Sequence, residues 1–265
     1  MKLLLFLLLA FISSFCFGQF NTKMTIEYSK NVGDSFEIYV SLPTGFSENT
    51  KYNVIYYCDA NLKSGRAMRQ LLSSPSYNSS LKNKIFVGIG HIGNYHVLRR
   101  RDFILPFING KDTVAKNKDY GHVDNFYSFL KDELIPSINS KYAINTDSNC
   151  IVGHSLGGLF AFYCLFKNDN LFAKYFALSP ALWIDNYSIY HFNKLNNGFS
   201  NGKFLYFAAG GNETMNYILN GTNQAKQFLD ARKYTNLHYI YDVHQNKTHN
   251  SEVPISLAKI LNELL

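Results

Sequence analysis

Residues 149–167 read Asn-Cys-Ile-Val-Gly-His-Ser-Leu-Gly-Gly-Leu-Phe-Ala-Phe-Tyr-Cys-Leu-Phe-Lys. An apolar run at residues 150–152 leads into a turn, and an apolar pattern of helical period follows the turn at once. The turn matches G-x-S-x-G, which holds a serine at a strained backbone angle between a strand and a helix. Gly153 and Gly157 lack the Cβ that would crowd such a turn. The stretch therefore predicts an α/β fold in which Ser155 stands above the sheet edge as a nucleophile.

The G-x-S-x-G pattern alone is common by chance, so a glycine-rich turn with an incidental serine is the alternative interpretation. The helix after the turn points its N terminus, with unpaired N–H groups, at the place where an oxyanion would form. The sequence places a strand, both glycines and a helix in the order that such a turn needs. This order favours the interpretation of Ser155 as a nucleophile.

Strands and helices alternate on both sides of this turn. Upstream, residues 24–29 and 35–42 alternate apolar and polar positions around a turn cluster and predict an antiparallel hairpin. The other expected strands are residues 52–58, 85–90, 174–178, 203–209 and 237–243, and the other expected helices are residues 66–72, 124–141, 224–233 and 254–265. This order predicts a mostly parallel sheet with an antiparallel start and helices on both faces.

Two details of this chain are less regular. Residues 91–120 lose periodicity, and so long an irregular segment in a compact domain is usually functional. In the helix at residues 124–141, Asp124 is the expected N-cap, and Pro136 is expected to kink or end the helix.

Length and composition fit one domain over residues 19–265. The chain has 265 residues, 46% of them hydrophobic, which suffices for a large core. The net charge is +7, but the basic residues are scattered except for Arg99, Arg100 and Arg101. This distribution gives no nucleic-acid footprint. No Cys/His spacing typical of zinc and no further phosphate-binding loop is found, so we expect no metal and no organic cofactor.

The N terminus predicts a secretion signal at residues 1–18. Lys2, an apolar stretch and small residues before a cut after Gly18 have the order of such a signal. We expect a secreted or periplasmic protein without stable membrane insertion; an uncleaved anchor is the alternative. The mature chain would keep Cys58, Cys150 and Cys164, which we expect to be buried free thiols.

A serine nucleophile needs a base, and the base needs an orienting carboxylate. In α/β-hydrolases the chain order is serine, acid, histidine. His244 and His249 both follow the last predicted strand, and we favour His249 because a loop before the final helix can carry its ring to the turn. Glu213 follows the strand at residues 203–209 and is the expected acid, with Asp185 and Asp242 as alternatives.

The oxyanion hole of such an enzyme uses two backbone N–H groups. One belongs to the residue after the nucleophile, here Leu156. The other is expected in the loop after residues 52–58, where we select Asn61, with Ala60 as the next choice.

Several segments resemble one family, the α/β-hydrolase esterases that include siderophore trilactone esterases, feruloyl esterases, S-formylglutathione hydrolase and mycolyltransferases. The similarity extends over nearly all of the mature chain. The segments are Tyr-Tyr-Cys-Asp-Ala-Asn at residues 56–61, Arg-Asp with Pro106 at residues 101–106, Phe-Leu-Lys-Asp-Glu-Leu-Ile-Pro at residues 129–136, Gly-His-Ser-Leu-Gly-Gly at residues 153–158 and Ser-Pro-Ala-Leu-Trp-Ile-Asp-Asn at residues 179–186. Ala60 stands where the family pattern has glycine.

The resemblance implies a serine esterase in which Ser155 is the nucleophile and His249 the base. It supports Glu213 through a Gly-x-x-Glu segment, although some relatives work with serine and histidine and no strong acid. The expected partner is a small-molecule ester, either a siderophore lactone or a plant cell-wall acyl ester. An acyltransferase and a catalytically silent binding protein of the same fold are the alternatives.

We also expect Arg100, Arg101, His154 and Trp183 to contact the substrate. The arginines of residues 99–101 would meet an anionic group through charge-assisted hydrogen bonds. The alternative is an Arg-Asp pair with Asp102 that only fixes the loop.

Overall fold

One eight-stranded sheet runs through the part of the chain that the computed structural model describes, residues 20–74, 79–106, 119–193, 195 and 198–265. The predicted secretion signal lies outside these residues. The strands are β1 (Phe20–Ser29), β2 (Asp34–Pro43), β3 (Asn53–Cys58), β4 (Lys84–His91), β5 (Cys150–His154), β6 (Lys174–Leu178), β7 (Gly198–Gly210) and β8 (Thr235–His244). Every predicted strand is therefore present.

The strand order is β1-β2-β4-β3-β5-β6-β7-β8. β1 and β2 form the predicted antiparallel hairpin, and β2 pairs with β4 in the same sense. All pairs from β4 to β8 are parallel. The carboxyl ends of β3, β5, β6, β7 and β8 therefore meet at one edge of the sheet, the edge at which ligands of open α/β sheets bind.

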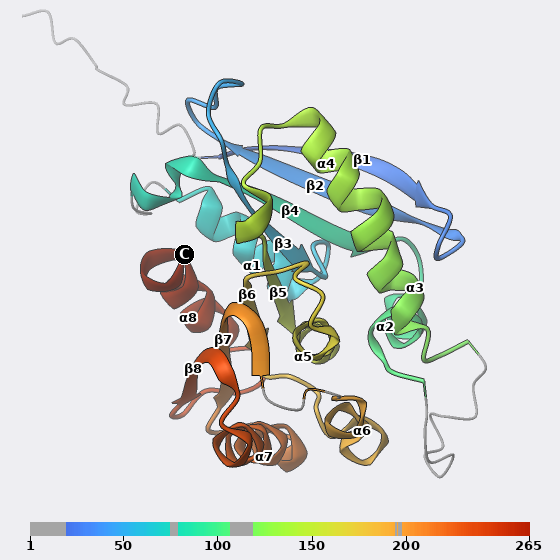
Figure 1. Cartoon of the computed structure of the whole chain (residues 1–265), viewed down its shortest axis with the longest axis vertical. Coiled ribbons are helices and arrows are strands. Elements are labelled where there is room, and N and C mark those ends of the chain that lie inside the picture. Colours follow the sequence, from blue (N-terminus) through green and yellow to red (C-terminus); the bar gives the residue numbers. More distant parts are fainter. Residues whose placement is uncertain (1–19, 75–78, 107–118, 194, 196–197) are drawn as a thin grey trace, which may run out of the picture.

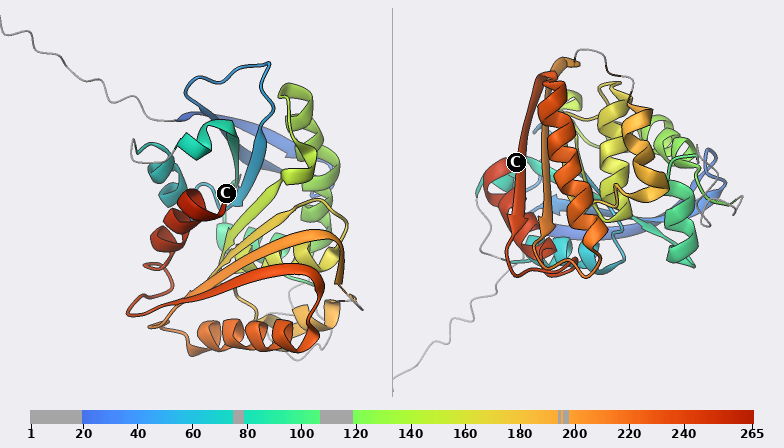
Figure 2. Two further views of the ribbon diagram at one scale, coloured as in Figure 1. Left: turned by 60° about the vertical axis from the view of Figure 1, so that its left-hand side comes forward. Right: turned by 90° about the horizontal axis from the view of Figure 1, so that it is seen from below.

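Helices cover both faces of the twisted sheet (Figures 1 and 2). They are α1 (Lys63–Leu72), α2 (Tyr95–Phe103), α3 (Val123–Ser128), α4 (Ile135–Lys141), α5 (Leu156–Lys167), α6 (Ile184–Phe192), α7 (Asn216–Arg232) and α8 (Val253–Lys259). Short turns of 3₁₀ helix occupy Ser79–Asn83 and Thr146–Ser148, and π-helical stretches occupy Phe129–Leu134 and Ile260–Leu264.

Alternating strand residues serve two separate cores, as the period of a strand requires. On β3, Val54, Tyr56 and Cys58 belong to the larger core, whereas Ile55 and Tyr57 belong to the smaller core under α1 and α8. The cysteines Cys58, Cys150 and Cys164 are buried free thiols. None of the helices in the described residues is both long enough and apolar enough to span a membrane.

Three local expectations need correction. Residues 91–120 are not irregular throughout, because α2 lies among them, while residues 107–118 fall outside the described residues. Asp124 is not the N-cap of α3, which begins after His122. The helix does not end at Pro136, because it continues to Lys141. A π-helical stretch, Phe129–Leu134, leads without a break into α4, so the helix continues through Pro136, which has no N–H to donate to the preceding turn.

Candidate active site

Ser155 sits at the turn between β5 and α5, as the sequence predicts. Its backbone has φ 60° and ψ −115°, a conformation that non-glycine residues rarely adopt. The surrounding structure holds it there, because its N–H donates to the Leu178 carbonyl at 2.9 Å and its own carbonyl accepts from Ala181 at 3.0 Å. A Cβ on Gly153 would come within 2.0 Å of the Gly157 carbonyl oxygen, so only glycine fits beside the turn.

The loop after β8 brings His249 to the carboxylate that follows β7. His249 Nδ1 lies 3.1 Å from Glu213 Oε2. An ionised carboxylate only accepts hydrogen bonds, so Nδ1 carries the hydrogen and Nε2 stays free to accept a proton. His249 is 14% exposed and Glu213 is 1% exposed at the side chain, which leaves the imidazole accessible and the carboxylate shielded from water.

Glu213 is surrounded by hydrogen-bond donors. Its Oε1 accepts from Ser179 Oγ at 2.6 Å and from the Gly210 N–H at 3.2 Å. Burial by itself raises the pKa of Glu213, but hydrogen bonds from His249, Ser179 and Gly210, together with the charge of His249, outweigh burial, and the pKa is lowered. Glu213 is therefore ionised when His249 needs an anionic partner.

The alternative residues have other partners. His244 lies at the end of β8, where its Nε2 is 2.9 Å from Ser256 Oγ. Asp242 accepts from Lys259 Nζ at 2.7 Å. Asp185 is buried in α6, and Glu213 stands in its place beside the histidine.

The loop after β3 is held by arginines of α1. Arg69 donates to the Ala60 carbonyl, and Arg66 Nη1 donates to the Asn61 carbonyl at 2.7 Å. The Ala60 carbonyl and the Asn61 N–H belong to one trans peptide unit, so they point in opposite directions. A guanidinium on the carbonyl therefore turns the Asn61 N–H away from α1.

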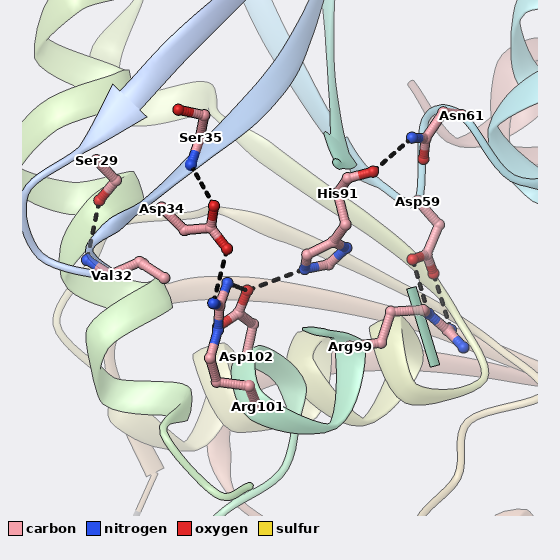
Figure 3. A network of polar contacts seen from close by, with 10 residues as sticks. All are labelled: Ser29, Val32, Asp34, Ser35, Asp59, Asn61, His91, Arg99, Arg101 and Asp102. Carbon is pink, nitrogen blue, oxygen red and sulfur yellow. Dashed lines mark hydrogen bonds and ion pairs between the residues drawn. The ribbon is translucent and has the colours of Figure 1, made fainter. Parts of the chain in front are cut away.

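The hydrogen bonds of this loop distinguish between the two candidates for the second oxyanion N–H, Asn61 and Ala60. The Ala60 N–H donates to the Ile89 carbonyl at 2.9 Å and is not available to a ligand. Within the described residues, neither the Asn61 nor the Leu156 amide has a protein acceptor. The Asn61 side chain is itself fixed, since its Nδ2 donates to the His91 carbonyl at 2.8 Å (Figure 3).

Arg99 joins this loop to the nucleophile turn. Its Nε and Nη2 donate to the two carboxylate oxygens of Asp59 at 2.8 and 2.9 Å (Figure 3), and Nη2 also lies 3.2 Å from the His154 carbonyl. Asp59 is fully buried and has φ 60°, so the ion pair fixes a strained residue next to the loop.

A cavity of about 460 Å³ opens at this edge of the sheet. Ser155 and His249 both line it, together with residues of α1, α2 and the neighbouring loops: Asp59, Leu62, Lys63, Ser64, Arg66, Tyr95, Arg99, His154 and Asn250. No hydrogen bond joins Ser155 Oγ to His249 among the described contacts, and such bonds are often loose before substrate binds.

The predicted substrate contacts divide into two groups. His154 lines the cavity, and its Nε2–H donates to the His249 carbonyl at 2.9 Å. Burial, and then the nearby His249 and Arg99, lower the pKa of His154 to about 3, so it is a neutral donor. Trp183 is not a lining residue and packs on Tyr217, with a ring distance of 4.3 Å.

Arg100 and Arg101 do not line the cavity either. Arg100 Nη1 donates to the His96 carbonyl at 2.7 Å. Arg101 binds Asp102 through Nε at 2.7 Å and Asp34 through Nη1 at 2.8 Å, and Asp102 also contacts His91 (Figure 3). Arg101 therefore has the fixing role, and of the three arginines at residues 99–101 it is Arg99 that lines the cavity.

Sequence reasoning missed Ser179 and Glu252, which adjoin Glu213. Ser179 Oγ contacts the carboxyl groups of both Glu213 and Glu252, and Ser179 has φ 39° directly after β6. A polar residue at the carboxyl end of a parallel strand is a signal that could have identified Ser179.

No group of three or more His, Cys, Asp or Glu side chains suited to a metal ion occurs in the described ranges.

Comparisons with known proteins agree with this geometry. The family model Esterase, described as "Putative esterase", matches residues 29–252. The ferri-bacillibactin esterase BesA of Bacillus subtilis is 26% identical over 230 residues, 83% of this chain and 76% of BesA. A siderophore enterobactin esterase of Emericella nidulans is 28% identical over 170 residues, 58% of this chain and 56% of that protein. The crystal structure of BES protein from Bacillus cereus matches this structure with a TM-score of 0.77 at 27% identity. The match covers 91% of this chain and 94% of the BES chain.

The family match spans most of the chain, and the sheet order and strained serine turn accord with it. The chain therefore belongs to this esterase family of α/β-hydrolase fold and is a carboxylic ester hydrolase.

Proposed function

We propose that the protein hydrolyses esters through an acyl-enzyme formed on Ser155. The observation that carries this proposal is the contact between His249 Nδ1 and Glu213 Oε2, with His249 and Ser155 in the walls of one cavity. An acid, a base and a strained serine from three different loops have few other uses in combination.

The proposed reaction has two halves. His249 Nε2 takes the proton of Ser155 as its oxygen attacks the ester carbonyl, and the imidazolium then gives that proton to the leaving alcohol. The amides of Leu156 and Asn61 receive the charge that develops on the carbonyl oxygen. A water molecule, deprotonated by His249 in the same way, releases the acid and restores Ser155.

We propose a siderophore-type ester with anionic groups as the substrate class. The relatives named above are a ferri-bacillibactin esterase and an enterobactin esterase. Among the cavity residues, Asp59 neutralises Arg99, which leaves the side chains of Lys63 and Arg66 as a positive rim. Such a rim attracts an anionic substrate and orients it.

The proposal includes export from the cytoplasm, because residues 1–18 have the order of a secretion signal. Expression of the full chain followed by mass analysis of the mature N terminus tests it. A chain that begins at Gln19 supports export, and a full-length cytoplasmic chain contradicts it.

Replacement of the nucleophile tests the mechanism. Ser155→Ala is expected to lower kcat for an aryl ester by at least a thousandfold with an unchanged melting temperature. A fluorophosphonate probe should attach to Ser155 of the wild type, and peptide mapping locates the adduct. A label elsewhere, or an active alanine variant, would contradict the mechanism.

The rim is tested with Lys63→Ala and a pair of matched esters, one anionic and one neutral. KM for the anionic ester should rise several-fold more than KM for the neutral ester, and the difference should shrink at high salt. Lys51→Ala removes an exposed lysine that does not line the cavity and serves as the control. Equal effects of the two variants would remove the rim from substrate binding.

A further inference from the structure

A second buried carboxyl group lies behind the predicted catalytic acid. Glu252 precedes α8 and is fully buried. Ser179 Oγ lies 2.6 Å from Glu213 Oε1 and 3.1 Å from Glu252 Oε1, so one hydroxyl stands between two carboxyl groups. The other oxygen of Glu252 accepts from Ser256 Oγ at 2.6 Å.

The number of hydrogens available for hydrogen bonds between Ser179 and the two carboxyl groups limits which of these groups can be ionised. A serine hydroxyl has one hydrogen to donate, and two ionised carboxylates would both need it. Two negative charges in contact with one buried hydroxyl would also repel each other in a site with little water. Both difficulties disappear if one of the two carboxyl groups carries a proton.

The surroundings determine which group holds the proton. Glu213 accepts from His249 and from the Gly210 N–H in addition to Ser179, which favours its ionised form. Glu252 has only hydroxyl partners, and no lysine or arginine contacts it among the described residues. The ionisable groups around Glu252 are Glu213, reached through Ser179, and Tyr206 of β7 and His244 of β8, both reached through Ser256.

We propose that Glu252 is protonated below neutral pH and donates its hydrogen to Ser179 Oγ, which makes Glu252 a positioning residue for the Glu213–His249 pair. Ser179 then gives its own hydrogen to Glu213 Oε1, and Glu213 Oε2 is left to face His249. In accord with this, burial raises the pKa of Glu252 to about 7. The negative charge of Glu213 raises this pKa further, whereas hydrogen bonds from Ser256 and Ser179 lower it. If Glu213 takes the Ser179 hydrogen, that hydrogen cannot also stabilise an ionised Glu252.

The backbone of Ser179 supports a positioning role. Its φ of 39° is rare for a residue other than glycine, and its N–H donates to the Ala208 carbonyl of the neighbouring strand at 2.7 Å. A strained conformation of this kind persists only where the surrounding structure enforces it. Here the strain directs a hydroxyl between two carboxyl groups that lie 39 positions apart in the sequence, at residues 213 and 252.

Infrared difference spectra of the wild type and Glu252→Gln test the proton directly and without turnover. We expect a protonated-carboxyl band at pH 6 that Glu252→Gln lacks and that fades as the pH rises above neutrality. A carboxylate band at pH 6 would overturn the proposal.

Stability gives a second readout. A carboxyl group whose folded pKa is raised costs stability as the pH climbs from its ordinary value of 4.5 toward about 7. The melting temperature of Glu252→Gln relative to the wild type should therefore rise over that range and level off above it. A difference that does not change with pH would contradict a buried, protonated Glu252.

Kinetics test the positioning role, which rests on the serine esterase proposed above. Glu252→Ala should lower kcat about tenfold, the value of roughly one hydrogen bond, with little change in KM. Glutamine has the donor and acceptor of a protonated carboxyl group, so Glu252→Gln should restore most of kcat and lack any alkaline decline that the wild type shows.

Ser179→Ala should resemble Glu252→Ala, whereas Ser41→Ala is the control, since Ser41 is buried in β2 with Thr22 as its partner. The positioning role is wrong if kcat falls as much in Glu252→Gln as in Glu252→Ala. It is also wrong if kcat falls as much in Ser41→Ala as in Ser179→Ala. A wild type that binds no fluorophosphonate and cleaves no ester, but shows the carboxyl band, would refute the proposed function and leave the protonation standing.

Discussion

The two sides of the catalytic edge are held by different chemistry. Between β3 and α5, guanidinium groups of Arg66, Arg69 and Arg99 bind backbone carbonyls and Asp59. Between β6 and α8, no lysine or arginine contacts Glu213 or Glu252 in the described part of the chain. Serine hydroxyls and a histidine contact them instead.

In the mechanism proposed above the two sides have separate tasks, and this difference fits them. Guanidinium groups stay charged at all working pH values, so they suit a loop that only has to present the Asn61 amide in one orientation. A fixed cation on Glu213 would compete with the imidazolium that forms when His249 accepts a proton. Neutral hydroxyl donors fix the carboxylate and leave its charge available to His249.

The largest effect is expected when the base is removed. His249→Ala should lower kcat by on the order of a thousandfold or more, whereas His244→Ala should be mild, because His244 contacts Ser256 and not the cavity. Steady-state kinetics on an aryl ester measure both. The opposite ranking of the two variants would move the base to His244.

A smaller loss is expected for the acid. Glu213→Gln should lower kcat about a hundredfold, because the imidazolium loses its anionic partner while the shape is kept. The lowered pKa of Glu213 means that its ionised form stabilises the fold above the ordinary value of 4.5, and this contribution is lost as the pH falls through the folded value. The melting temperatures of the two proteins should therefore converge below pH 4.5. A melting-temperature difference between the two proteins that does not change with pH would show that ionisation of Glu213 does not stabilise the fold.

On the oxyanion side, Arg99→Lys is expected to lower kcat about tenfold with little change in KM, because an ammonium cannot bind both oxygens of Asp59 and the loop loosens. Arg99→Ala should in addition lower the melting temperature, since it leaves the fully buried Asp59 without its ion partner. Unchanged kcat in the lysine variant would show that the ion pair does not position the loop.

The smallest effect on activity is expected for Arg101→Ala. Arg101 braces Asp102 and Asp34, away from the cavity, so kcat and KM should change by less than about twofold while the melting temperature falls by several degrees. Thermal denaturation and kinetics on anionic and neutral esters check this. A selective rise in KM for the anionic ester would return Arg101 to the substrate site.

Some features of the site follow from local sequence. The turn around Ser155 needs two glycines at fixed spacing between an apolar run and a helical pattern, and those requirements all lie within residues 149–167. The positions of Glu213 and His249 follow from a weaker rule, that polar groups after parallel strands converge at one edge. The eight strands were predictable because period and turn residues are also local signals.

Other features were decided only by the tertiary structure. Arg99 and Arg101 are two positions apart in α2, and a helix turns about 100° per residue, so one reaches the cavity and the other reaches β2. Their sequence neighbourhood is the same, and only the docking of α2 assigns their partners. The contact of Ser179 with Glu252 spans 73 positions, and no local pattern records it. Long-range partners depend on how elements pack, whereas a turn depends on the residues that form it.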